Sequence, residues 1–132
     1  MIGVEYVAGF FDGEGCVSLA RQKSYFRSPR WSLVVNASNS DPTPLEAIAA
    51  RWGGRVRSTS RASDSHPGYL WQHVWTCPAK QVEPFLRAIR PYAIVKADQI
   101  DLALKFVALG PTVAKRLGAD ARVTQLREFI YL

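Results

Sequence analysis

The stretch Val7-Ala8-Gly9-Phe10-Phe11-Asp12-Gly13-Glu14-Gly15 lies near the start of the chain, and the rest is organised around it. Apolar residues in and just before it recur at the spacing of one helix face, which predicts a helix from residue 3 to residue 13. Ala8 and Gly9 share a second face with Asp12. Small residues on that face would let another backbone come close.

Two glycines predict where this helix ends. Gly13 and Gly15 readily adopt the positive φ that a helix exit often needs, so two carboxylates, Asp12 and Glu14, are left at the C-terminal end. Negative charge is unfavourable there, because the helix dipole is also negative at that end. Two interpretations follow: solvated acids beside a glycine-rich turn, or carboxylates that hold a cation.

The nine residues resemble the signature of the LAGLIDADG homing endonucleases: an apolar residue, Ala-Gly, two apolar residues, Asp, a small residue, an acid and Gly. The resemblance implies that the acid at the eighth position, Glu14, binds metal. The motif occurs once in this chain, and single-motif members of the family are homodimers. The resemblance therefore implies a homodimer, with Ala8, Gly9 and Asp12 at the interface.

Composition is compatible with a polyanionic partner. The 132 residues form one predicted domain, residues 1–132, with 17 Lys and Arg against 11 Asp and Glu and a net charge of +6. No apolar run of membrane-spanning length and no signal peptide is present, which predicts a soluble intracellular protein without a membrane partner. Cys16 and Cys77 lack metal-ligand spacing, so two buried free thiols are expected. His66 and His73 are too isolated for a histidine metal site.

The remaining pattern predicts an α+β fold. Alternation of apolar and polar residues predicts strands at 16–27, 30–38, 55–61 and 69–77. Helical spacing predicts helices that start with Asp41 as N-cap and Pro42 as first helical residue, then at 78–90, at 93–109 and near the C-terminus. In the fourth strand, Leu70 and Val74 compete with Trp71 and Trp75 for the core. The order α-β-β-α-β-β-α with extra C-terminal helices is that of the LAGLIDADG fold, a four-stranded antiparallel sheet with helices on one face.

One face of the predicted sheet carries arginines. Arg55, Arg57 and Arg61 share one side of the third strand, and arginine suits both guanine edges and phosphate. The alternative is an ordinary solvated sheet face. The resemblance favours a sheet laid in the major groove of double-stranded DNA. The predicted contacts are Ser18, Ala20, Gln22, Arg30, Ser32, Val34, Asn36, Arg55, Arg57 and Thr59.

Two further site residues are implied by the resemblance. The family has a polar residue near the scissile phosphate after the second strand, and Asn39 stands there. It also places a lysine near the active site after a Pro-aromatic pair, and Lys96 follows Pro91-Tyr92. The chain departs from the family at 41–44, where some members carry a basic residue and this chain has none.

The implied activity is site-specific hydrolysis of double-stranded DNA at a long, near-palindromic target, as in intron homing, without a small-molecule substrate. Glu14 from each subunit and the Gly13 carbonyl would hold Mg²⁺, with Mn²⁺ as a substitute, because Mg²⁺ needs few protein carboxylates. Lys96 would stabilise developing charge and Asn39 would orient water. The alternatives are a catalytically reduced DNA-binding or RNA-splicing maturase protein on the same fold, and an unrelated basic RNA-binding protein. No aromatic stacking motif or GXXG clamp supports the last one.

Overall fold

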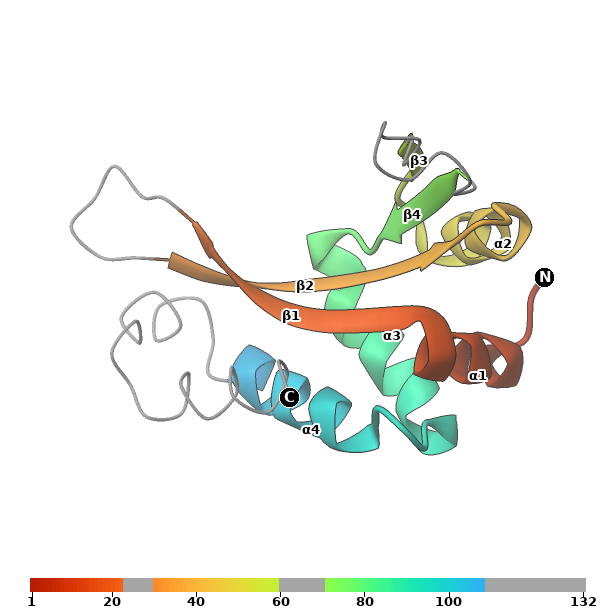
Figure 1. Cartoon of the computed structure of the whole chain (residues 1–132). Helices are drawn as coiled ribbons and strands as arrows, with labels where there is room; N and C mark the ends of the chain where they lie inside the picture. The colour runs from red at the N-terminus through yellow and green to blue at the C-terminus, as the bar shows by residue number, and fades with distance from the viewer. Residues whose placement is uncertain (23–29, 60–70, 109–132) are drawn as a thin grey trace.

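The computed structural model describes residues 1–22, 30–59 and 71–108 (Figure 1). Its element order confirms the predicted α+β layout, with one helix after the αββαββα core. The last helix predicted near the C-terminus lies outside the described residues. The final two residues of the strand predicted at 55–61 lie outside them as well. The helices and strands are α1 (Val4–Glu14), β1 (Gly15–Gln22), β2 (Arg30–Asn39), α2 (Thr43–Trp52), β3 (Val56–Thr59), β4 (Gln72–Thr76), α3 (Val82–Ile89) and α4 (Ala97–Ala108).

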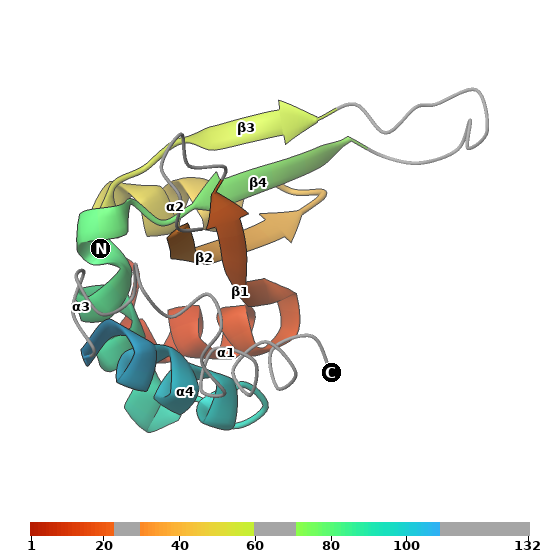
Figure 2. The same ribbon diagram turned by 90° about the vertical axis from the view of Figure 1, so that its left-hand side faces the viewer.

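The four strands form one antiparallel sheet in the order β1-β2-β4-β3. The helices lie on one side of it (Figure 2), where α1, α2, α3 and α4 all contact strands. No helix of the described part of the chain covers the opposite side. The predicted architecture, a layer of helices on one sheet face, is therefore confirmed. No helix within those ranges is long and apolar enough to cross a membrane.

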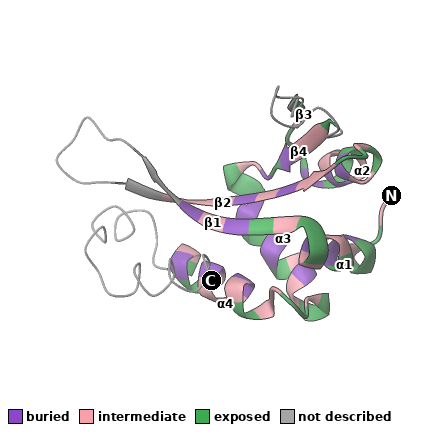
Figure 3. Ribbon diagram, viewed as in Figure 1, coloured by how far each residue is buried: buried purple, intermediate pink, exposed green. Residues whose placement is uncertain are grey.

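The core lies between the helices and the sheet (Figure 3). Alternation buries Val17 and Leu19 on β1, and Val17 pairs with the buried Val35 of β2. Trp75 is fully buried, which settles the face of β4 that meets the core. Its indole nitrogen Nε1 donates to the carbonyl oxygen of Gly53 at 2.8 Å. The sequence alone left this face undecided, because both phases of β4 are apolar.

One aromatic side chain joins the two layers of the core. The ring of Phe85, on α3, lies 5.4 Å from that of Phe11, 5.1 Å from that of Trp52 and 5.2 Å from that of Trp75. The contacts with Phe11 and Trp52 are edge to face, which aromatic pairs prefer. Phe85 therefore fixes α1 and α2 against the sheet from one point.

The first helix ends later than its glycines predict. Gly13 lies inside α1, Glu14 is the last helical residue, and Gly15 is the cap, with its N–H bonded to the carbonyl of Phe11. The φ of Gly15 is −84°, so the exit uses no positive φ; only Gly53 and Gly54 have one among the described residues. The predicted left-handed exit is wrong, because the chain passes from α1 directly into the extended backbone of β1.

Other boundaries move by a few residues. Helix α2 begins at Thr43, with Pro42 as its N-cap, and the carboxylate of Asp41 accepts the Thr43 N–H at 2.9 Å. Asp41 therefore still bonds to the start of the helix, but it stands one residue before the N-cap position that was predicted for it. Strand β2 extends to Asn39, and α4 begins only at Ala97. Residues 93–96 are not helical because their backbone N–H groups bond elsewhere, as described next.

Candidate catalytic centre and nucleic-acid interface

The C-terminal end of α1 meets the sheet at its first strand. Gly15 follows Glu14 at once and pairs with Ala37 of β2. A Cβ atom on Gly15 would overlap the ring of Phe11, so glycine is required there by the chain's own core. Glu14 is exposed. The carboxylate of Glu14 is thus exposed at the junction of α1 and β1, and the last turn of α1 fixes its backbone.

Asp12, one turn from that end, is bound within its own chain. Its Oδ2 accepts the N–H of Ile94 at 2.8 Å and of Val95 at 3.2 Å, and its Oδ1 accepts the N–H of Lys96 at 3.1 Å. Burial alone would raise the pKa of Asp12, but these three N–H groups and the Lys96 charge together lower it. Asp12 was expected at the interface with a second chain, but its carboxylate caps the segment that leads into α4 of the same chain.

Lys96 is drawn to the same helix end. Its Nζ donates to the carbonyl oxygen of Asp12 at 2.7 Å, a last-turn carbonyl without an intrahelical partner. Glu14 lies two residues further along the chain. The structure therefore brings together two of the predicted catalytic residues, Lys96 and Glu14, at the end of one helix.

Asn39 has a different environment. Its Oδ1 accepts the backbone N–H of Asp41 at 3.2 Å and the Ser40 hydroxyl at 3.4 Å, so the amide closes the turn into α2. Asn39 pairs with His73, two positions beyond the pair of Ala37 and Trp75. By alternation it belongs to the helix side of the sheet. The structure does not place Asn39 on the open face, and its role in water orientation stays a prediction.

A histidine overlooked in the sequence lies beside Asn39. His73 is its partner across the strands, and its Nδ1 is 2.8 Å from the Ser58 hydroxyl of β3. The bonds from Thr43 lower the pKa of Asp41, with a smaller contribution from the charge of His73. His73 is thus a basic side chain close to the stretch 41–44, which has none itself. Strand register, unknown from the sequence, is what brings it there.

The backbone register gives the strand positions predicted to contact DNA one common phase, that of the sheet face away from the helices. Ser18 pairs with Val34, Ala20 with Ser32, and Gln22 with Arg30. Arg57 pairs with Val74, Thr59 with Gln72, and Asn36 with both Cys16 and Thr76. These pairs all have the phase opposite to the buried Val17, Val35 and Trp75. Arg55 precedes β3 and is exposed, and Arg61 lies outside the described residues.

Five positions of this open face were not predicted: Cys16, Ser38, Gln72, Val74 and Thr76. Ser38 pairs with Val74, and Asn36 lies between Cys16 and Thr76. Alternation within β2 already indicated Ser38, since it continues the phase of Asn36. The others depended on where β1 begins and on which face of β4 is buried.

The predicted dimer face is only partly available. Ala8 is fully buried in the chain's own core, so it has no surface to offer a second chain, and that part of the expectation is wrong. Gly9 and Gly13 are exposed, and a Cβ atom on either would meet nothing within 4 Å. Their side of α1 is the one that remains open.

The described residues contain no group of three or more His, Cys, Asp and Glu side chains able to hold a metal ion. Both carboxylate oxygens of Asp12 already accept N–H groups. Glu14 is therefore the one acid at this helix end whose carboxylate is left to bind a cation. A single chain offers a hard oxygen donor but an incomplete site, which fits an ion that keeps waters and takes ligands from its substrate.

Comparison with known proteins identifies the fold. No family model matches the chain, and no curated protein matches it significantly. Among solved structures, the archaeal intron-encoded homing endonuclease I-Vdi141I, complexed with DNA, is similar with a TM-score of 0.71 and 18% identity, over 97% of this chain and 81% of the other. The homing endonuclease I-CvuI, in complex with a DNA target and Mg, is similar with a TM-score of 0.70 and 16% identity, over 97% and 79%.

A third similar structure belongs to a protein named as a LAGLIDADG homing endonuclease. The LAGLIDADG homing endonuclease I-GzeII, in complex with its DNA target, has a TM-score of 0.66 and 17% identity, over 98% of this chain but only 43% of the other. The chain therefore spans about four fifths of the length of two of these proteins and less than half of the third. It has the LAGLIDADG homing endonuclease fold, as its nine-residue signature predicted.

Proposed function

We propose that two copies of this chain form a site-specific, metal-dependent endonuclease of double-stranded DNA. The observation that carries the proposal is the exposed Glu14 at the end of α1, next to an open sheet face lined by polar and basic side chains. Because the sequence identity with the similar structures is low, the likeness shows a shared fold alone. The function is therefore argued from the site itself. The complexes of those neighbours with DNA support the same conclusion.

DNA binding is supported by the open face. Arg57 projects from β3 and Asn36 from β2, and both side chain types can bond two atoms of one base edge in the major groove. Ser18 and Val34 offer a hydroxyl and an apolar surface between them. The net charge of +6 per chain favours association with the phosphate backbone. A long site read by two copies would be near-palindromic, because a twofold dimer presents the same face to each half.

Metal binding is supported by the donor at the helix end. Glu14, one from each copy, and the Gly13 carbonyl are hard oxygen ligands, and phosphate oxygens would complete the set. A bound Mg²⁺ would supply charge for the developing oxyanion and lower the pKa of a bound water. Two Glu14 side chains from two copies are needed because one chain holds only one such acid at this place.

Lys96 has the position for charge stabilisation. Its Nζ donates to the Asp12 carbonyl oxygen, so this group is held near the end of α1. A fixed cation close to the scissile phosphate stabilises negative charge that develops during cleavage. Asn39, at the end of β2, keeps the predicted role of orienting water, although it lies on the helix side of the sheet with its cross-strand partner His73 of β4.

The test combines cleavage and binding on one duplex. A library of random duplexes is incubated with the protein and Mg²⁺, and the cut ends are sequenced to obtain a target. Glu14→Gln removes the charge at nearly constant size, so it should abolish cutting while binding to the target stays intact or tightens. Glu83→Gln, an exposed acid on α3, is the matched control and should cut normally.

The outcomes separate the candidates. Cutting by Glu14→Gln at a rate near that of the wild type contradicts the catalytic assignment. Specific binding by the wild type without cutting in Mg²⁺ or Mn²⁺ supports the DNA-binding or maturase alternative. No specific DNA binding contradicts the proposal as a whole.

A further inference from the structure

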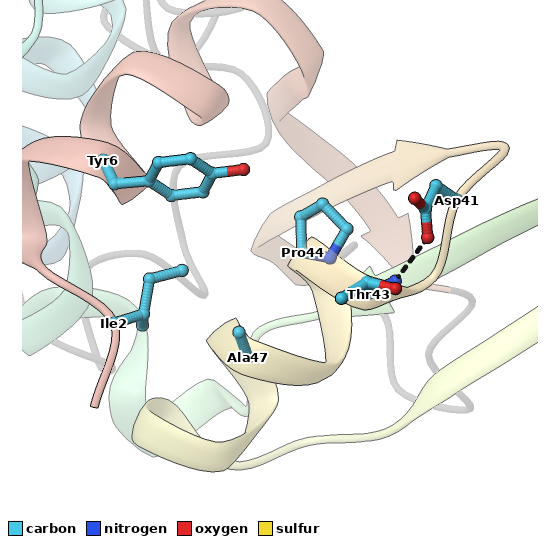
Figure 4. A pocket seen from close by; sticks show the side chains of 6 residues that line it. All are labelled: Ile2, Tyr6, Asp41, Thr43, Pro44 and Ala47. Carbon is cyan, nitrogen blue, oxygen red and sulfur yellow. Dashed lines mark hydrogen bonds between the residues drawn. The ribbon is translucent and has the colours of Figure 1, made fainter.

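Most of the polar side chains where β2 ends serve the turn that follows. Asn39 accepts the Asp41 N–H and the Ser40 hydroxyl at its Oδ1. Asp41 in turn accepts the Thr43 N–H at 2.9 Å, and Figure 4 shows this bond at the edge of the hollow between α1 and α2. The side chains of residues 39–41 are therefore all engaged within the turn itself.

Ser38, the residue before this turn, is different. Within the described ranges its hydroxyl has no hydrogen-bond partner. It has the phase of the open face, because Ala37 beside it is fully buried on the helix side. Its cross-strand partner on that face is Val74, whose side chain neither donates nor accepts a hydrogen bond. The Ser38 hydroxyl is therefore left to bind a molecule that lies on the open face.

Strand register brings Ser38 to the end of α1. Gly15 pairs with Ala37 at the first position that β1 and β2 share. Glu14 is the residue before Gly15, and Ser38 is the residue after Ala37. Because the strands are antiparallel, Glu14 and Ser38 both follow the first pair on the same side of it. Adjacent strands lie about 4.8 Å apart, a spacing that a carboxylate, a cation and a hydroxyl can bridge.

Glu14 by itself is an incomplete cation site. Mg²⁺ takes an octahedral set of oxygen ligands, but both carboxylate oxygens of Asp12 accept backbone N–H groups. Lys96 Nζ donates a hydrogen bond at this helix end and offers the ion no lone pair. A hydroxyl adds a neutral oxygen that does not repel DNA phosphate. The serine or threonine hydroxyl that binds Mg²⁺ in phosphate-binding loops is a ligand of this type.

We infer that the Ser38 hydroxyl is a second side-chain ligand of the divalent cation that Glu14 binds in the same chain. The inference rests on the proposed function and adds one residue to its site. The hydroxyl oxygen binds the ion through a lone pair and keeps its proton, which it donates in a hydrogen bond to a phosphate oxygen or a water. Each copy of the chain carries the same pair of residues at the end of its α1.

A thiol in place of the hydroxyl gives a spectroscopic test without DNA. Because thiolate sulfur binds soft cations, Ser38→Cys in a Cys16→Ser background should bind Cd²⁺ and produce the ultraviolet charge-transfer band of a cadmium thiolate. Addition of Glu14→Gln should weaken this binding by about 10- to 100-fold, the loss that follows removal of a group from a metal site. Cys77 is buried and should add no band of its own.

Ser32→Cys in the same background is the matched control. Ser32 lies on the same strand and the same face and is half-buried like Ser38. It is six positions away, which is about 20 Å along a strand. A thiol there should bind Cd²⁺ weakly, and equally with and without Glu14→Gln. The unfolding midpoint of each variant, measured before the cation is added, checks that the chain is folded.

The Mg²⁺ requirement of cleavage is the second measurement. On a target duplex, Ser38→Ala should raise the Mg²⁺ concentration for half-maximal cleavage by about 10- to 100-fold. Ser38→Thr keeps the hydroxyl and should restore the requirement of the wild type. Ser38→Cys should cut poorly in Mg²⁺ and recover in Mn²⁺, which accepts softer ligands. Ser32→Ala should leave the Mg²⁺ requirement unchanged, whatever its effect on DNA affinity.

The results separate this inference from the proposed function. A cadmium band of Ser38→Cys that is absent, or that is insensitive to Glu14→Gln, overturns the inference. A wild-type Mg²⁺ requirement in Ser38→Ala also overturns it, and weaker binding of the duplex alone then means that Ser38 contacts only DNA. A band that depends on Glu14, in a protein that cuts no duplex, leaves the inference standing and contradicts the proposed function.

Discussion

Lys96 is held by Asp12 at two points: its backbone N–H donates to Asp12 Oδ1 at 3.1 Å, and its Nζ donates to the Asp12 carbonyl oxygen at 2.7 Å. An acid of the signature and the lysine at the start of α4 are 84 residues apart in the chain. They form one unit at the end of α1. The two acids of the signature thus have separate roles, since Asp12 positions the lysine and Glu14 is left exposed.

Removal of the Lys96 charge is the first prediction. Lys96→Met keeps the length of the side chain, so binding to a target duplex should change little while the cleavage rate falls about 10²–10³-fold, as when one charge-stabilising group is lost. Single-turnover cleavage with saturating protein measures this. Lys80→Met, an exposed lysine before α3, is the control. A cleavage rate unchanged in Lys96→Met assigns this lysine to structure alone.

Acid stability is the second prediction. The pKa of Asp12 is lowered in the folded chain, below 3.8, so the unfolded chain binds more protons just below that pH. The stability that Asp12 contributes is present above about pH 4 and is lost as the pH falls through the folded pKa. Asp12→Asn should be less stable at neutral pH, by about 1–3 kcal/mol for lost charge-assisted bonds.

The difference in the free energy of unfolding between the wild type and Asp12→Asn should therefore become smaller as the pH falls. Urea unfolding of the wild type and Asp12→Asn at a series of pH values from 7 to 3 measures it. A constant difference across that range contradicts the assignment of the stability to the ionised carboxylate. The other acids titrate in both proteins and cancel in the comparison.

The sequence predicted the layers of this fold better than its contacts. The apolar spacing of Val7 and Phe11 identified α1, and alternation identified the strand phases, because both depend on neighbours within a few residues. The sequence analysis assigned Ala8 to an interface. The buried face of α1 is wider than the apolar spacing indicates and includes Ala8 as well as Val7 and Phe11. The sequence analysis also assigned Asp12 a partner in another chain, since no local pattern indicates a capped segment more than 80 residues away.

The positions of site residues could be predicted where they depend on neighbours in the sequence, and not where they depend on strand pairing. The exposed position of Glu14 followed from its place in the signature and the open-face position of Arg57 from alternation, while the roles of both stay predictions. The sequence analysis placed Asn39 just after the second strand, but β2 includes it. Because side chains alternate along a strand, this added residue assigns Asn39 to one face of the sheet. His73 could not be identified because its place beside Asn39 depends on the register of β2 and β4.

The glycine that ends α1 gives the third prediction. Gly15→Ala should destabilise the chain by about 1–3 kcal/mol, because the new methyl group overlaps the Phe11 ring and that ring is packed against Phe85. Gly13→Ala, two residues earlier, has open space and should instead stabilise the separated chain by up to about 1 kcal/mol. Chemical unfolding at a concentration that favours monomers measures both. Equal effects of the two changes would contradict this account of the signature.

The arginine of β3 gives the fourth prediction. Arg57→Ala should weaken binding to a selected duplex by about 1–3 kcal/mol and relax the preference at particular base pairs. Its place opposite Val74 on the open face is the reason. Arg87→Ala, on α3 on the helix side, is the control and should change neither affinity nor preference. Binding to a panel of single-base variants of the duplex distinguishes the cases: uniform weakening across the panel means that Arg57 contacts phosphate only.

The two cysteines differ in their access to solvent, which gives the last prediction. Cys77 is buried as expected, but Cys16 is exposed and pairs with Asn36 on the open face, so the expectation of two buried thiols is wrong for Cys16. Burial raises the pKa of the Cys77 thiol to about 12, so it stays protonated and unreactive near neutral pH. N-ethylmaleimide should therefore modify one thiol per folded chain. Mass spectrometry of peptides identifies it as Cys16.

Modification of Cys16 should then abolish DNA binding, because the adduct stands between β1 and β2 on the surface proposed to enter the major groove. Cys16→Ser should bind DNA and be unaffected by the reagent, which separates the effect of the adduct from general damage. The unfolding midpoint of the modified wild type should match that of the untreated protein, since the side chain is exposed. Modified protein that binds its target as tightly as before would show that DNA does not lie on this face of the sheet.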